Sequence, residues 1–261
     1  MADYPAELEL ESPFGHFRVP VEHSLTVPPV DVVWVTVKST QLEAALASLP
    51  TAEEIGAIVP LLNGVEHVAA LRAKYGAERV VPATIAVEAE RVGPGKFVHR
   101  SPFANLNVAA IGKPVLGDSV GRLSQLGFTC RFVEDENTLL WSKLVFLAPL
   151  ALTTTASSRT VGEVLSHDEW RGKLFACIRE ASAVAVAERA KIDAESVIAT
   201  MSGLPSFMRS SMQKDVEQGR TPELDAIAGA ILRGADRHHV EVPVTRELVS
   251  NIAIRVLGLR V

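Results

Sequence analysis

The chain has 261 residues, of which 48% are hydrophobic and 22% charged, and its formal net charge is -5 at pH 7. This length allows two modest domains with an apolar core, and the acidic balance argues against nucleic acid or an anionic membrane as a general partner. The only cysteines, Cys130 and Cys177, form no CxxC pair, which favours a reduced intracellular protein. The acidic, proline-containing amino terminus does not resemble a secretory signal, so we expect a cytoplasmic protein.

Residues 1–133 alternate short apolar runs with helical patterns, which is typical of an α/β layer. "AELELES" and "HFRVPVE" flank "PFG" and predict an antiparallel hairpin. "DVVWVTV" at 31–37 and "IGAIVPLL" at 55–62 predict buried strands of a parallel sheet, each followed by a helical pattern. Further strands are predicted at "RVVPATIAV", "GKFVH", "ANLNVAAIG" and "TCRFV".

Residues 134–261 lose the strand signals, and apolar residues recur at three- and four-residue spacing, which predicts an all-helical domain. Its most apolar stretch, "WSKLVFLAPLALTTTA", is interrupted by Lys143 and Pro149 and is shorter than the roughly 18 apolar residues of a membrane span. We interpret it as a buried helix. The fold class expected is thus an α/β amino-terminal domain with a partial Rossmann-type sheet, followed by an all-α domain.

The chain has no HExxH or GxxxxGK[ST] motif. Its seven histidines show no metal-ligand spacing, and the adjacent His238 and His239 are interpreted as surface or capping residues. Metalloenzyme functions therefore lose most of their support, and we expect no metal.

Polar residues follow the two predicted parallel strands. Lys38 and Asn63 would lie at the carboxyl edge of the sheet, where Rossmann-type folds bind ligands. The structural alternatives are a solvated strand terminus for Lys38 and a helix N-cap for Asn63.

Three further polar residues stand in the helical half. Lys143 lies among apolar residues, so its ammonium either reaches out to solvent or occupies a dry cleft, where a lowered pKa would suit a proton donor. Ser211 and Asp215 are four residues apart and share a helix face. Glu223 follows Thr221 and Pro222, which are a plausible N-cap and first helical residue, so its carboxylate would lie in a first turn or belong to a site.

Several of these stretches resemble one family: "DVVWVTVKSTQ", "LLNGVEH", "RVGPGKFVH", "WSKL", "SSMQKD", "GRTPELDAIAG" and "VEVPVT". In this order and spacing, across nearly the whole chain, they are similar to ketopantoate reductases, the NADPH-dependent 2-dehydropantoate 2-reductases of pantothenate biosynthesis. The resemblance implies a truncated Rossmann-type dinucleotide-binding domain over 1–133. It implies a substrate-binding and dimerisation domain over 134–261, of the helical type seen in 6-phosphogluconate dehydrogenase.

The resemblance also implies roles for individual residues. Lys143 would donate a proton to the keto oxygen, Ser211 would contact substrate, and Glu223 would lie near the nicotinamide and the catalytic lysine. Lys38 would contact the cofactor, and Asn63 both cofactor and substrate. NADPH is then the expected cofactor and a small 2-keto acid the expected substrate.

Two departures from the family pattern qualify this picture. Leu147, Ala151 and Ala228 stand where family members usually carry asparagines, which favours a more apolar keto acid. The glycine-rich GxGxxG unit that precedes "DVVWVTV" in the family is missing, so we expect either a misassigned chain start or weak NADPH binding. The alternatives are a non-catalytic relative that binds a ligand or dimerises through its helical domain, and another dehydrogenase with a helical carboxyl domain.

Overall fold

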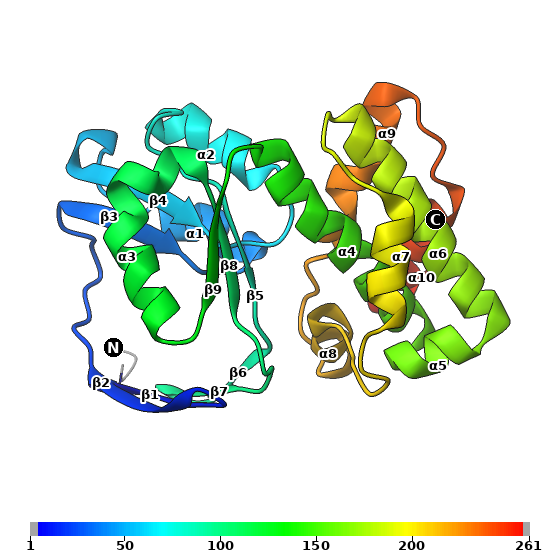
Figure 1. Cartoon of the computed structure of the whole chain (residues 1–261), viewed down its shortest axis with the longest axis horizontal. Coiled ribbons are helices and arrows are strands. Elements are labelled where there is room, and N and C mark those ends of the chain that lie inside the picture. Colours follow the sequence, from blue (N-terminus) through cyan, green and yellow to red (C-terminus); the bar gives the residue numbers. More distant parts are fainter. Residues whose placement is uncertain (1–4, 258–261) are drawn as a thin grey trace. The chain divides into compact units, whose positions relative to one another are not determined.

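The computed structural model describes residues 5–257, which form two compact units (Figure 1). The first, here called the sheet unit, comprises the chain up to Val37, Gln41–Leu62 and Val68–Glu134. The second, the helical unit, comprises the chain from Asp135 onward together with two short segments, Lys38–Thr40 and Asn63–His67. These two segments follow strands of the sheet unit in the sequence, but they pack with the helices.

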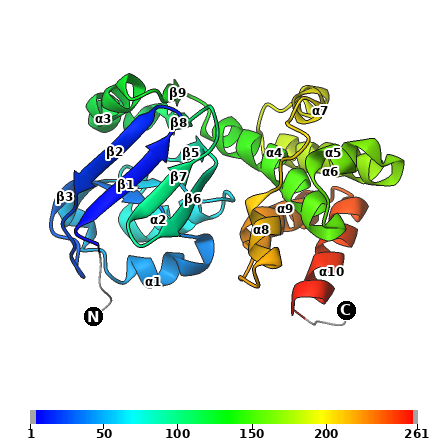
Figure 2. The ribbon, with the colours of Figure 1, turned by 90° about the horizontal axis from the view of Figure 1, so that it is seen from below.

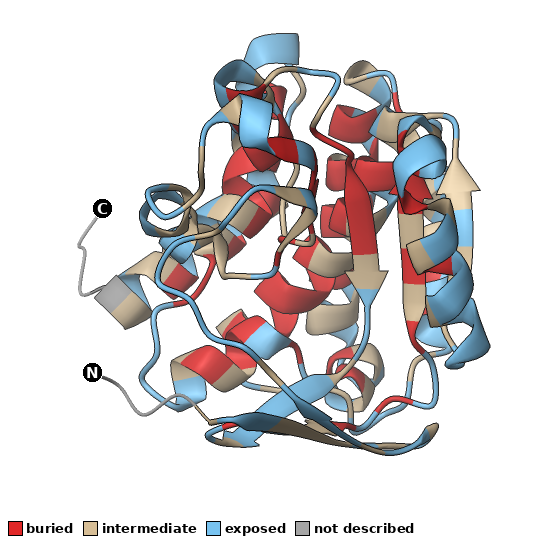
Figure 3. Cartoon of the chain, turned by 90° about the vertical axis from the view of Figure 1, so that its left-hand side faces the viewer, coloured by how far each residue is buried: buried red, intermediate tan, exposed pale blue. Residues whose placement is uncertain are grey.

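The predicted hairpin is present in the sheet unit. Strands β1 (Glu7–Ser12) and β2 (Gly15–Pro20) pair antiparallel, and β1 also pairs parallel with β7 (Lys96–His99). Strand β6 (Ala89–Gly93) completes a sheet of order β2-β1-β7-β6, visible in Figure 2. Most of its residues are exposed or half-buried, as the pale blue and tan strands of Figure 3 show, so this sheet contributes little to the core.

The buried layer of this unit contains the predicted parallel strands. Strand β3 (Val30–Val35) pairs in parallel with β4 (Ile55–Pro60), and β4 is buried at all but one position. Within residues 5–257, β3 has a strand partner on one side only. A third sheet has the order β5-β8-β9, with β5 (Ala83–Ala86) antiparallel and β9 (Thr129–Val133) parallel to β8 (Asn105–Ala109).

Helices connect these strands. They are η1 (Ser39–Gln41), α1 (Leu42–Leu46), η2 (Ala52–Glu54), α2 (His67–Tyr75), η3 (Ala110–Gly112) and α3 (Lys113–Gln125). Helix α3, which packs on β9, was not predicted, because Gly117 and Gly121 weaken its helical pattern. Both glycines face open space, so neither serves a close contact.

The helical unit confirms the predicted all-α class. Its elements are α4 (Glu136–Ser157), α5 (Val161–Ser166), α6 (Asp168–Ala187), α7 (Ala194–Ser202), α8 (Ser211–Glu217), the π-helical turn η4 (Asp225–Gly229), α9 (Ala230–His238) and α10 (Pro243–Leu257). The helical spacing of the sequence extends over 205–219, but α8 begins only after Ser210, whose hydroxyl accepts the backbone N–H of Gln213 as an N-cap.

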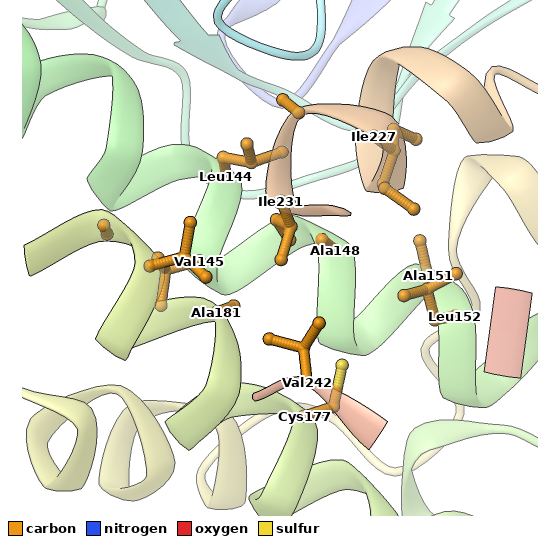
Figure 4. Close-up of a cluster of buried hydrophobic side chains, with 14 of the residues drawn as sticks. Leu144, Val145, Ala148, Ala151, Leu152, Cys177, Ala181, Ile227, Ile231 and Val242 are labelled. Atoms are coloured by element: carbon orange, nitrogen blue, oxygen red, sulfur yellow. The ribbon is translucent and has the colours of Figure 1, made fainter. Parts of the chain in front are cut away.

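Helix α4 forms the centre of the helical core. Its Leu144, Val145 and Ala148 pack with Cys177 and Ile231 in the cluster of Figure 4. The helix is long and apolar enough to cross a membrane, but 72% of its most apolar window is buried inside the protein. The prediction of a buried helix is thus confirmed, whereas the expectation that the apolar stretch is too short for a membrane span is wrong.

Candidate active site

Lys38 lies three residues beyond β3, in the segment that packs with the helices. Its Nζ donates to Oδ2 of Asp215 over 2.8 Å, and Nε of Arg220 donates to the other oxygen over 2.7 Å. The Asp215 side chain is only 8% exposed, whereas those of Lys38 and Arg220 are 39% and 53% exposed. Lys38 is therefore held by a buried carboxylate, while its own side chain stays partly exposed beyond the strand.

Glu223 is the most densely bonded carboxylate of the site. It is 9% exposed, and its Oε1 accepts from both the backbone N–H and the hydroxyl of Ser39, each over 2.8 Å. Its Oε2 accepts from Nδ2 of Asn63 over 3.0 Å. Three donors from the two short segments thus hold this carboxylate in place.

The local structure around Glu223 and Asn63 differs from two sequence expectations. The helix that follows Glu223 begins at Leu224, so Thr221 is not its N-cap and Glu223 does not lie in its first turn. Helix α2 begins at His67, so Asn63 is not its N-cap either. Gly64 has φ +85°, and a Cβ at this position would collide with the carbonyl oxygen of Ala226. Glycine is therefore required where this segment meets the π-helical turn.

A second ion-pair cluster fixes the same segment. Arg233 donates from Nε to Oε1 of Glu66 over 2.9 Å and from Nη1 to Oδ1 of Asp225 over 2.7 Å. The two carboxylates raise the pKa of the guanidinium, which remains charged. Because Asp225 is two residues from Glu223, this cluster ties the Asn63–His67 segment to the chain that carries the site carboxylate.

Lys143 lies in the second turn of α4 and is half-buried, between the buried residues Trp141 and Leu144. Desolvation lowers the pKa of its ammonium to about 8, and the nearby carboxylate of Glu223 partly offsets this by favouring the charged form. Within residues 5–257 the Lys143 side chain makes no hydrogen bond, in contrast to Lys38. The lowered pKa favours the dry cleft over an ammonium that reaches out to solvent.

His67, to which the sequence analysis gave no role, is a neighbour of Lys143. It is 9% exposed, and burial followed by the positive charge of Lys143 lowers the pKa of its imidazole to about 4. The imidazole is therefore neutral at neutral pH. The available signal was its position four residues after Asn63 in "LLNGVEH", the stretch that also supplies the site asparagine.

Ser211 is the first residue of α8 and is exposed. The adjacent Ser210 is buried, and its hydroxyl hydrogen-bonds that of Thr154 over 2.9 Å, so Ser210 has a structural role. Of the two serines, only Ser211 is accessible to a ligand. No hydrogen bond within the described chain joins Ser211 to Lys143 or Glu223. Glu223 connects Asn63 and Lys143 directly, and Lys38 is joined to this group through its chain neighbour Ser39.

Apolar residues occupy the three positions where the family resemblance implies asparagines. Ala151 and Ala228 are fully buried in the helical core, and the half-buried Leu147 packs against it. Leu147 is one helical turn from Lys143 and so lies on the same face of α4. This face offers the surroundings of Lys143 no additional hydrogen-bonding side chain.

Within residues 5–257, no three or more His, Cys, Asp or Glu side chains lie close enough together to hold a metal ion. His238 is exposed and bonds Glu188 over 3.1 Å. The interpretation of this histidine as a surface residue is thus confirmed.

Comparison with known proteins gives the same family over both halves of the chain. Residues 6–112 match the family model described as ketopantoate reductase PanE/ApbA, and residues 136–255 match its C-terminal counterpart. A 2-dehydropantoate 2-reductase of Caulobacter vibrioides is 30% identical over 231 residues, which cover 86% of this chain and 77% of the relative. A 2-dehydropantoate 2-reductase of Mycobacterium tuberculosis is 30% identical over 229 residues, with 86% and 76% covered.

Solved structures share the fold. A PanE/ApbA family ketopantoate reductase from Ralstonia eutropha JMP134 superimposes with a TM-score of 0.84 at 23% identity, over 97% of this chain and 86% of that one. A D-mandelate dehydrogenase solved with NADH and anilino(oxo)acetate gives 0.83 at 19% identity, over 96% and 85%. With the family models covering most of its length, this chain belongs to the ketopantoate reductase PanE/ApbA family of oxidoreductases.

Proposed function

We propose that this protein is an NADPH-dependent reductase that converts a small 2-keto acid to the 2-hydroxy acid, with Lys143 as the proton donor. The observation that carries the proposal is the state of that side chain. Its ammonium is desolvated, makes no hydrogen bond in the described chain, and lies near a carboxylate held by three donors. A pKa of about 8 leaves the amine protonated at neutral pH yet ready to release its proton, as a general acid requires.

The residues present fit the reacting end of a nicotinamide cofactor. Asn63 offers an amide that binds Glu223, and Lys38, the chain neighbour of Ser39, offers a cation, as a polar nicotinamide ring and a substrate carboxylate would need. The 261 residues contain no GxGxxG, so we assign no residue to the pyrophosphate. In this proposal residues 1–133 bind the dinucleotide and residues 134–261 bind the substrate.

The chemistry requires two transfers to the keto group. The bound cofactor supplies the hydride, which goes to the carbonyl carbon while the π electrons of the C=O bond move to the oxygen. Lys143 gives a proton to that oxygen and is left as a neutral amine, which takes up a proton from solvent before the next turnover. Glu223 acts through its charge, because its carboxylate holds the ammonium in the protonated form that the reaction needs.

The substrate we propose carries an apolar side chain. Leu147, one turn from Lys143, replaces a hydrogen-bonding residue with an aliphatic one, and Ala151 and Ala228 leave no polar group behind it. A site without hydrogen-bonding partners leaves a substrate hydroxyl unpaired, which costs about 1–3 kcal/mol. Exposed Ser211 is the proposed contact for the substrate carboxylate.

The test is NADPH oxidation with a panel of 2-keto acids that bear branched apolar or hydroxylated side chains. Lys143→Met should reduce kcat by about 10²- to 10⁴-fold, the usual contribution of a general acid. The matched control is Lys173→Met, which removes a lysine of the same unit that is paired with Glu169 and Glu247 and should retain full activity. Saturable keto-acid binding without turnover, even at saturating NADPH, would instead identify a non-catalytic binding protein.

A further inference from the structure

One buried nitrogen of the site has no hydrogen-bond partner within residues 5–257. It is Nε2 of His67, and the half-buried Lys143, whose ammonium makes no hydrogen bond in the same part of the chain, lies nearby. The two groups are close enough for the charge of Lys143 to disfavour the protonated imidazole. Both lie in the helical unit, His67 at the start of α2 and Lys143 in α4.

An unpartnered buried nitrogen is unusual. More than nine in ten buried polar groups in native proteins are hydrogen-bonded, and leaving one unpaired costs about 1–3 kcal/mol. A histidine kept for packing alone would be replaceable by an apolar side chain without this cost. Other buried atoms of residues 5–257 also lack a partner, but His67 lies within reach of the charge of Lys143, and this position points to a ligand atom that completes the bonding of His67 when it binds.

We propose that His67 is a catalytic residue, whose Nε2–H donates a hydrogen bond to the same substrate oxygen that receives the proton of Lys143. This inference rests on the keto-acid reductase function proposed above. A keto oxygen has two lone pairs, so it can accept from the imidazole and from the ammonium at once. No other single ligand atom of a 2-keto acid would satisfy both neighbouring donors while its carbon receives the hydride.

The charge state of His67 suits this role. An imidazolium beside the Lys143 ammonium would add a second positive charge, and burial opposes that form as well. The neutral ring offers one N–H, which stabilises the negative charge that develops on the oxygen without giving up its own proton. The proton and electron balance is thus unchanged, since Lys143 supplies the proton and the cofactor the hydride. Neutral histidines with lowered pKa values polarise carbonyl groups in this way in other enzymes.

The kinetic test compares His67→Leu with His67→Gln. Removal of one donor to a developing oxyanion usually lowers kcat by about 10²- to 10³-fold, and this is the loss expected for the leucine variant, with KM nearly unchanged. Glutamine keeps an N–H donor of similar reach and should recover at least tenfold of that loss. Ser182→Ala is the matched control, because Ser182 Oγ is also buried without a partner but lies on α6 in the helical core. It should retain wild-type kcat.

The pH dependence of kcat/KM distinguishes a hydrogen bond from His67 to the substrate from a hydrogen bond between His67 and the Lys143 amine. In His67→Leu the alkaline limb of kcat/KM should stay near pH 8, because the imidazole does not hold the ammonium in place. A fall of this limb by a full pH unit would show that His67 accepts a hydrogen bond from Lys143, and would overturn the proposal. Equal losses in the leucine and glutamine variants, with both folded, would overturn it as well.

A measurement without turnover distinguishes failure of this inference from failure of the proposed function. The carbon-bound ring protons of His67, followed by NMR, should titrate near pH 4 in the wild type and at higher pH in Lys143→Met, where the neighbouring charge is removed. The same titration with a saturating 2-hydroxy acid product should shift the His67 resonances and leave those of exposed His16 unchanged. If the pKa of His67 depends on Lys143 but no keto acid is reduced, the proposed function is wrong. If a keto acid is reduced and the His67 variants are as active as the wild type, only the proposed role of His67 is wrong.

Discussion

Lys38 and Lys143 carry the same ammonium group, but they differ in their hydrogen-bond partners and in their desolvation. Lys38 is 39% exposed and lies 2.8 Å from the buried carboxylate of Asp215, which also binds Arg220. Lys143 is half-buried and has no hydrogen-bond partner in the described chain, and the charge of Glu223 partly opposes the effect of desolvation on its pKa. One lysine is a fixed cation, and the other is a cation close to losing its proton.

The difference shows how one site obtains two functions from one residue type. An ion pair with a buried carboxylate keeps an ammonium charged and positioned, which suits the binding of an anionic ligand. A dry environment without a partner lowers the free energy of proton release, which suits proton transfer. The variants below test whether the Asp215 partner of Lys38 and the burial of Lys143 cause this difference between the two lysines.

The largest expected effect is on stability. Below pH 8 Lys143 is charged in both the folded and the unfolded chain. Desolvation of the ammonium on folding therefore lowers the free energy of unfolding by its full amount. Between pH 8 and 10.5 the folded chain releases the proton that the unfolded chain keeps, so stability rises with pH through this window. The shift corresponds to about 3 kcal/mol, by which Lys143→Met should be more stable than the wild type at pH 7.

Urea unfolding at pH 7 and pH 10 measures this difference. Lys173→Met is the matched control with the opposite sign, because two glutamates raise the pKa of Lys173 and its contribution is therefore stabilising below its usual value of 10.5. A Lys143→Met protein less stable than the wild type at pH 7 would contradict a desolvated amine.

Asp215→Asn removes the charge that distinguishes Lys38 from Lys143. We expect a loss of about 2 kcal/mol in the free energy of unfolding, less than the 3–5 kcal/mol of a fully buried pair, since Lys38 and Arg220 can turn to solvent. Chemical denaturation of Asp168→Asn, which breaks an ion pair whose aspartate side chain is 92% exposed, supplies the control and should cost less than about 0.5 kcal/mol. Equal losses in the two variants would mean that the burial of Asp215 is unimportant.

Glu223→Gln removes the negative charge that favours the protonated form of Lys143. Without the carboxylate the pKa of Lys143 falls further, so the alkaline limb of kcat/KM should move to lower pH. At pH 8 we expect about a tenfold loss of kcat, within the range of general acid catalysis. The control is Glu195→Gln, at an exposed carboxylate paired with Arg179, whose profile should match the wild type. An unmoved limb would show that Glu223 acts by hydrogen bonding alone.

Leu147→Asn gives the smallest expected change. A polar amide one turn from Lys143 should draw water toward the ammonium and raise its pKa, moving the alkaline limb upward by less than about one pH unit. The same variant should improve kcat/KM for hydroxylated relative to apolar keto acids. Leu126→Asn, at an exposed leucine of the sheet unit, is expected to change neither quantity.

Local sequence patterns predicted most of the architecture. Alternation and buried runs predicted the hairpin of β1 and β2 and the parallel pair of β3 and β4, and three- and four-residue spacing predicted the helices after residue 134. These predictions are correct because the spacing of apolar residues within one helix or strand indicates which of its faces is buried. That spacing is set by residues only a few positions apart. They failed at α3, where two glycines interrupt the pattern, and at residues 205–210, where a serine cap delays the helix.

The sequence by itself determined that a lysine lies within an apolar helix and that polar residues follow two parallel strands. Only the tertiary structure decided which groups meet, since Lys38 contacts a residue 177 positions away and Ser39 one 184 positions away. The environment of Lys143, the neutral state of His67 and the placement of Glu223 before its helix are consequences of this packing. Desolvation and charge depend on distances through space, and the spacing of residues along one element carries no information about them.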